Sequence, residues 1–315
     1  MTTYKESVLS AREDFLKLSS RQEKKLLQLY VELSKQLRID ILNCRTTSKE
    51  RYLKNLEEIV KLNIQELNGE LNKIIKSNID TSSQIASSVD SAYYKAITED
   101  VGLQAIFQST VLNNSRQTVS KLIKGRFYED KRSLDARLWR ISDKSIKDID
   151  TLIKINVLKG ANAKELAQQV EKYVNPMKKL TMRKDYVGFY KDVSYQSTRL
   201  ARTSITHSFN ECALSQAYSN PFNKGMKWVL SSEHSIRMHG KRDVCDEYAE
   251  QNRYDLGTGV FILSEVPLAH CNCICHQYEI TTDIDQAIKD LKAWNNGEKN
   301  KELDKWYREY NKKVV

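Results

Sequence analysis

Cysteines and histidines concentrate near the C-terminus, in the segment 270–276 (HCNCICH), and Cys245 lies well before it in the chain. Thiolates and imidazoles that come from two separate segments are the usual ligands of a tetrahedral Zn²⁺ ion. Residues two apart in an extended segment share a face, so Cys273 and Cys275 can direct their sulfurs to one side. His270 stands three residues before Cys273, a spacing that a tight turn can fold onto one ion. Any fold that uses this pattern must bring residue 245 against the loop 270–275.

The sequence therefore predicts a structural Zn²⁺ site with four protein ligands and Asp246 as a supporting carboxylate outside the first shell. Other donors nearby could replace a member of the set, and a reduced, metal-free cluster or a disulfide are the alternatives. A disulfide between residues two apart would be strained. The remaining cysteines, Cys44 and Cys212, are expected to be small buried hydrophobic residues. The predicted ligands are Cys245, His270, Cys273 and Cys275, and the possible replacements are His234, His239, Cys271 and His276.

Long helices are expected over most of the chain, because it has only 3 Pro and 10 Gly among 315 residues. Apolar residues at three- and four-residue steps predict helices over about 4–42, 48–76, 92–124, 133–158, 164–173, 194–218 and 284–294. The Ser-rich stretch 78–91 is interpreted as a joint or a weak helix. Alternating segments at 226–230 and 277–280 predict a pair of strands that flanks the Cys/His loops. The fold class is thus α+β and predominantly α-helical, with a small C-terminal α/β unit.

Four consecutive parts are expected along the chain. Residues 1–115 form an N-terminal helical module, 116–193 a basic helical middle region, 194–282 a C-terminal domain with the Cys/His cluster, and 283–315 a helical tail. Within the second helix, Leu53, Val60, Leu67 and Ile74 repeat every seven residues, with Leu56 offset by three, which is typical of a helix-packing seam. Limited proteolysis is expected within 78–92 or near residue 175.

Positive charge is unevenly distributed. The net charge is +10, and residues 115–147 hold ten Lys/Arg against four Asp/Glu, while 172–202 hold eight against two. A basic zone of this kind suits a polyanion such as DNA, although a solvated helix surface carries similar charge. Trp139 and Trp228 are expected to be core residues rather than platforms for base stacking. The candidate DNA-binding residues are Lys121, Lys124, Arg126, Lys131, Arg132, Arg199 and Arg202.

The first residues of the chain lack the apolar segment of a secretory signal, and no apolar run is long enough to cross a bilayer. We therefore expect a protein made in a reducing cytoplasm, where cysteines serve metals or cores rather than disulfides.

Several segments resemble, in order, those of the phage head morphogenesis family of minor capsid proteins (phage Mu F-like). These are 128–139 (YEDKRSLDARLW), 201–204 (ARTS), 227–230 (KWVL), 243–246 (DVCD) and 267–275 (PLAHCNCIC), and the resemblance covers roughly residues 120–282. Lys131 replaces a family Gly, Ser204 a Glu, Cys271 a Pro and Ile274 an Arg. The last two departures leave the positions of His270, Cys273 and Cys275 unchanged.

The resemblance implies a low-copy component of the capsid interior that is present in the host cytoplasm before assembly. Such proteins act in head morphogenesis or DNA ejection, associate with the portal and with major capsid or scaffold proteins, and can contact double-stranded DNA without sequence preference. Contact with a membrane during ejection is a further possibility. We expect no enzymatic activity, with a zinc hydrolase as the alternative.

Two other functions remain open. One is a zinc-dependent nuclease or hydrolase, because Asp243, Asp246 and Glu247 are carboxylates beside the predicted metal. Four protein ligands, however, favour a closed, structural site over a catalytic one. The other is a helical scaffold protein without DNA binding, in which the basic zone faces an acidic protein partner.

Overall fold

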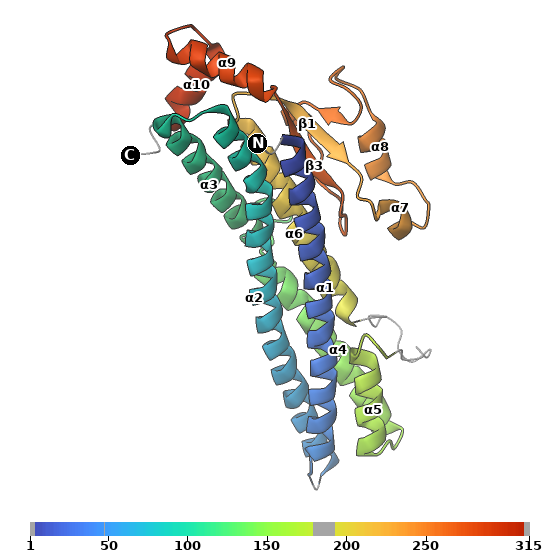
Figure 1. The fold of residues 1–315 in the computed structure, drawn as a ribbon. Coiled ribbons are helices and arrows are strands. Elements are labelled where there is room, and N and C mark those ends of the chain that lie inside the picture. The colour runs from blue at the N-terminus through green and yellow to red at the C-terminus, as the bar shows by residue number, and fades with distance from the viewer. Residues whose placement is uncertain (1–3, 47, 179–192, 312–315) are drawn as a thin grey trace. The chain divides into compact units, whose positions relative to one another are not determined.

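The computed structural model describes residues 4–46, 48–178 and 193–311 (Figure 1). It has a predominantly α-helical α+β fold with one small antiparallel sheet, as the sequence predicts. Contacts divide the chain into two discontinuous units. We call residues 1–19, 78–122 and 202–315 the sheet unit, and residues 20–77 and 123–201 the helical unit. These boundaries differ from the four consecutive parts expected from the sequence, because α1, α2, α3 and α6 each contribute residues to both units.

Helices α1 (Tyr4–Asn43), α2 (Lys49–Ile97), α3 (Val101–Ile123) and α6 (Val193–Ser219) are the long elements (Figure 1). The predicted end of the second helix near residue 76 is wrong, since α2 continues through the whole Ser-rich stretch. Ser82, Ser83 and Ser87 are buried there. Ser82 Oγ donates to Ile205 O of α6 at 2.8 Å, and the Oγ atoms of Ser83 and of Ser115 in α3 lie 2.6 Å apart. Small hydroxyl side chains therefore support close helix packing at this point, and no joint forms.

The helical unit also contains α4 (Leu134–Leu158) and α5 (Ala163–Val174). Both helices begin at a side-chain cap: Ser133 accepts from Ala136 N, and Asn162 forms a capping box with Glu165. Gly125, with φ +73°, ends the turn after α3, and a Cβ there would lie 2.1 Å from Arg132 O. The buried stripe of α2 in this unit runs at steps of three and four residues through Leu56, Val60, Ile64, Leu67, Leu71 and Ile75. Leu53 and Ile74 of the predicted seven-residue repeat are only half-buried.

The sheet of the sheet unit has strand order β2-β1-β3, all antiparallel. Strands β1 (Asn223–Val229) and β3 (His276–Thr281) are the predicted pair, with Trp228 opposite Gln277. The short strand β2 (Val260–Phe261) was not predicted, because two residues are too few to show alternation. Short helices α7 (His234–Arg237) and α8 (Val244–Glu250) follow β1, and a 3₁₀ turn, Leu263–Glu265, follows β2.

The C-terminal helices α9 (Ile284–Asn295) and α10 (Lys301–Tyr310) belong to the core of the sheet unit. Trp306 of α10 stacks on Phe107 of α3, with ring centroids 4.2 Å apart, and Phe107 stacks on Tyr94 of α2 at 4.1 Å. A separate core cluster contains Trp228 and Phe261 together with the cysteines of the predicted metal site. The predicted site is thus part of a hydrophobic core and is held by the sheet.

Candidate metal centre

The first turn of α8 carries Cys245 and is fixed by a capping box. Asp243 accepts from Cys245 N at 2.7 Å, and Asp246 Oδ2 accepts from Asp243 N at 2.8 Å. Cys245 is fully buried, and its Sγ lies 3.6 Å from Cys273 Sγ. The capping signal in the sequence (DVCD) therefore places this thiol against the distant loop, as the metal prediction requires.

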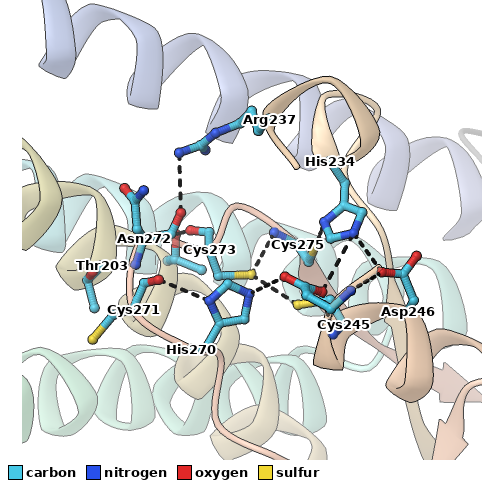
Figure 2. Close-up of polar contacts among 12 residues, drawn as sticks. Thr203, His234, Arg237, Cys245, Asp246, His270, Cys271, Asn272, Cys273 and Cys275 are labelled. Atoms are coloured by element: carbon cyan, nitrogen blue, oxygen red, sulfur yellow. Dashed lines mark hydrogen bonds and ion pairs between the residues drawn. The ribbon is translucent and has the colours of Figure 1, made fainter. Parts of the chain in front are cut away.

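The loop between the 3₁₀ turn and β3 supplies two further thiols. Cys273 N donates to His270 O at 3.2 Å, which closes the predicted tight turn, and Asn272 occupies it with φ +68°. Asn tolerates this left-handed conformation better than most residues do. Cys273 and Cys275 are both buried, and Cys275 N donates to Cys273 Sγ at 3.2 Å. Both sulfurs thus point to the inner side of the loop (Figure 2).

His270 reaches the same corner. The donor atoms of Cys245, His270 and Cys273 all lie within 4.8 Å of one another, so this group could bind a metal ion. His270 Nε2 lies 3.1 Å from Asp243 Oδ2, and its Nδ1 lies 3.0 Å from Cys271 O. Two sulfurs and an imidazole at such distances fit a soft or borderline metal such as Zn²⁺.

A second histidine lies at the same corner. His234 of α7 is buried, and its Nδ1 lies 3.5 Å from Cys275 Sγ. Its Nε2 lies 3.1 Å from Asp246 Oδ2 and 3.6 Å from Asp243 Oδ1. Asp246 therefore supports a histidine, as expected of an outer carboxylate, but that histidine is His234 (Figure 2).

The three thiols share protons among themselves. Hydrogen bonds from Cys245 and Cys273 lower the pKa of the Cys275 thiol, and hydrogen bonding to its neighbours raises the pKa of the Cys245 thiol. These contacts favour ionisation of the Cys275 thiol over that of the Cys245 thiol. Binding of a dication would release the remaining protons, because metal ligation requires deprotonated thiolates.

The side of α6 that faces the loop holds the backbone of the loop in place. Thr206 Oγ1 donates to Cys273 O at 2.7 Å, and Asn210 Oδ1 accepts from Gln277 N at 3.0 Å. Thr203 Oγ1 accepts from Asn272 N at 2.8 Å, and Arg202 donates to the Asn272 side chain. Residues 202, 203, 206 and 210 share one helical face. The segment 201–204 thus positions the loop that carries Cys273, a role that spacing alone did not reveal.

A cavity of about 380 Å³ lies beside the cluster. Its lining includes His234, Asp243, His270 and Arg237, whose Nη2 donates to Asn272 O at 3.3 Å. The cavity gives the histidine side of the centre access to solvent, while the three sulfurs are buried in the core.

The other proposed replacements lie apart from the described donor groups. Cys271 is exposed, and His239, which follows α7, is exposed too. His276 is buried, and its burial lowers its pKa to about 3, so it stays neutral inside the core. Cys212 is a buried small residue as predicted, whereas Cys44 is only half-buried.

The candidate DNA-binding residues differ in their surroundings. Lys121 is exposed in the sheet unit, and Arg199 is exposed in the helical unit. Arg202 is half-buried and bonded to Asn272, so its described partner is the metal loop. Trp228 is a core residue as expected, but the same expectation for Trp139 is wrong, because that side chain is 62% exposed. The remaining candidates are exposed in the helical unit: Lys124, Arg126, Lys131 and Arg132.

Comparisons with known proteins give no match to a family model, to a curated protein or to a solved structure. Among the helices that the structure describes, none combines the length and the apolar character needed to cross a membrane.

Proposed function

We propose that the protein is a phage minor head protein in which a structural Zn²⁺ ion holds the corner of the sheet unit together. The observation that supports this proposal is that residues from four of the segments that resemble the phage family lie together in the sheet unit. Trp228 of 227–230, Cys245 of 243–246 and Cys273 of 267–275 belong to one buried cluster. Thr203 of 201–204 accepts a hydrogen bond from the loop that carries Cys273.

The ion would be held by the thiolates of Cys245, Cys273 and Cys275 together with an imidazole, for which His270 is the candidate from the sequence. Such a set is typical of closed structural sites, whose binding energy contributes directly to folding. In this role the protein associates with the portal and with capsid or scaffold proteins inside the head. It reaches this place from the host cytoplasm and acts in assembly, DNA ejection or both.

Double-stranded DNA is the proposed nucleic-acid partner. Exposed lysines and arginines near the start of α4 would neutralise phosphates without reading sequence. About four to six phosphate contacts would give a slope of about −4 to −5 in a plot of the logarithm of the binding constant against the logarithm of the salt concentration.

Gel retardation of duplex DNA at several salt concentrations tests this role. A charge-reversed variant of Lys124, Arg126, Lys131 and Arg132 should bind with a much flatter salt slope and unchanged sequence preference. A matched variant with the same charge change at exposed residues of α9, α10 and the segment between them should keep the slope; its positions are Lys289, Lys299, Lys301 and Lys305. Co-expression with the portal protein of the same genome, followed by size-exclusion chromatography, tests the association. Absence of both DNA retardation and portal binding would contradict the proposal.

A zinc-dependent nuclease is the second candidate, favoured by the cavity that His270 and Asp243 line. A carboxylate beside a metal-bound water can act as a general base. Metal-dependent cleavage of the DNA in the same assay would support the nuclease. Portal binding without retardation, even at low salt, would instead support the scaffold without DNA binding.

A further inference from the structure

His234 has the surroundings that a metal-bound histidine requires. A neutral imidazole ligates through the lone pair of one nitrogen and donates its other N–H to a carboxylate, a carbonyl or water. His234 Nδ1 lies 3.5 Å from Cys275 Sγ, on the side of the thiols, and Nε2 lies 3.1 Å from Asp246 Oδ2. The carboxylate accepts the Nε2 proton, and this leaves the Nδ1 lone pair on the side of the sulfurs (Figure 2).

His270 has different surroundings. Its Nδ1 lies 3.0 Å from Cys271 O, and its Nε2 lies 3.1 Å from Asp243 Oδ2 but is buried without a hydrogen bond. A ring that donates Nδ1–H to this carbonyl keeps a lone pair on Nε2, but no hydrogen-bonded carboxylate orients it as Asp246 orients His234. The side chain of His270 is also 36% exposed, whereas that of His234 is 9% exposed. His270 shares a donor group with Cys245 and Cys273, whereas His234 lies beside Cys275.

The two carboxylates have matching roles. Asp246 contacts His234 and Asp243 contacts His270, and both belong to the capping box at the start of the helix that carries Cys245. One short helix therefore fixes a thiol and both histidines. Three thiols and two imidazoles make five donors, one more than a tetrahedral ion takes.

We infer that His234 is a metal ligand of this centre, bound through Nδ1 beside Cys275 and oriented by Asp246. This inference rests on the metal site proposed above. His234 is the fixed, buried imidazole, and His270 is the exposed one that can be replaced by solvent from the cavity.

The test measures metal affinity of the full chain in reducing buffer, by competition with a chromophoric chelator for Zn²⁺ and by Co²⁺ absorption. His234→Ala should weaken Zn²⁺ binding by more than about 100-fold, beyond the 10–100-fold typical of losing an outer carboxylate. His270→Ala should weaken it by less than about 10-fold. The thiolate-to-Co²⁺ band should keep its intensity in both variants, because all three cysteines remain.

Two further variants separate ligation from a structural role. Asp246→Asn keeps a cap acceptor and should weaken binding about 10–100-fold. His234→Cys supplies a new thiolate, so it should restore metal binding and increase the thiolate-to-Co²⁺ band. If His234→Ala fails to fold, His234→Cys still tests the inference. Recovery of folding on addition of metal would support ligation by residue 234, and no recovery would overturn the inference.

Wild-type affinity in His234→Ala together with a large loss in His270→Ala would overturn the inference and leave the metal site itself intact. Absence of Zn²⁺ and Co²⁺ binding by the wild-type chain would overturn the metal site and this inference together. The two failures are therefore distinguishable in one set of measurements.

Discussion

A buried pair of carboxyl groups makes the stability of the sheet unit depend on pH. Asp90 of α2 and Glu279 of β3 are 4% and 3% exposed, and their side chains hydrogen-bond each other. Asn223 Nδ2 donates to Glu279 Oε1 at 2.7 Å, and the Tyr4 hydroxyl donates to Glu279 O at 2.8 Å. Asn223 therefore favours the ionised form of the Glu279 carboxyl, whereas Tyr4 bonds only the backbone carbonyl of that residue. Asp90 is the member that holds a proton more firmly.

Burial raises the pKa of both groups, that of Asp90 well above its usual range and that of Glu279 to about 7. The unfolded chain loses these protons near pH 4, whereas the folded chain keeps them to higher pH. The stabilising contribution is thus fully present below about pH 4 and is lost as pH rises through the folded pKa. For Glu279 alone, a folded pKa of about 7 corresponds to about 2–3 kcal/mol lost between pH 5 and 8.

Glu279→Gln removes this titration and keeps an acceptor for Asn223. We expect the free energy of unfolding of the variant, minus that of the wild type, to rise by about 2–3 kcal/mol from pH 5 to pH 8. Urea unfolding followed by tryptophan fluorescence measures it, because Trp228, Trp294 and Trp306 all lie in the sheet unit. The difference for the exposed control Glu298→Gln should vary by less than about 0.5 kcal/mol. A pH-independent difference for Glu279→Gln would refute the reasoning.

Three further outcomes are expected. Cys273→Ser should release the metal and lower Tm, whereas Cys271→Ser, at an exposed thiol, should change neither; metal analysis and thermal unfolding of the two variants check this. Thr206→Val should cost about 1–3 kcal/mol in urea unfolding and weaken Zn²⁺ binding, because Cys273 O loses its buried donor; unchanged metal affinity would contradict the positioning role of α6. Trp306→Ala should cost about 3–5 kcal/mol, since it removes the ring that stacks on Phe107, and a loss below about 1 kcal/mol would show that α10 contributes little to the core.

The continuity of α2 also changes an expectation from the sequence. Protease cleavage within 78–92 is no longer expected, because this stretch is helical and Ser82, Ser83 and Ser87 are buried in it. The alternative cleavage site near residue 175 stays a prediction.

Local patterns in the sequence determined the elements and part of the centre. Helical periodicity predicted α1 and α6, and alternation predicted β1 and β3. The spacing of His270 and Cys273 predicted the turn that joins them, and Cys245 was the correct distant thiol. These features follow from interactions between residues close in sequence, or from side-chain chemistry with few other uses.

Tertiary structure decided the rest. The Ser-rich stretch became a buried helix because its hydroxyls bond to backbone carbonyls and hydroxyls of distant helices, and composition does not encode those partners. His234 and the pair of Asp90 and Glu279 gained their surroundings from elements far apart in the chain. Their roles depend on burial and on which atoms face each ring or carboxyl group. Spacing in a sequence cannot determine the burial of a side chain or the atoms that surround it, because both arise only when separate segments pack together.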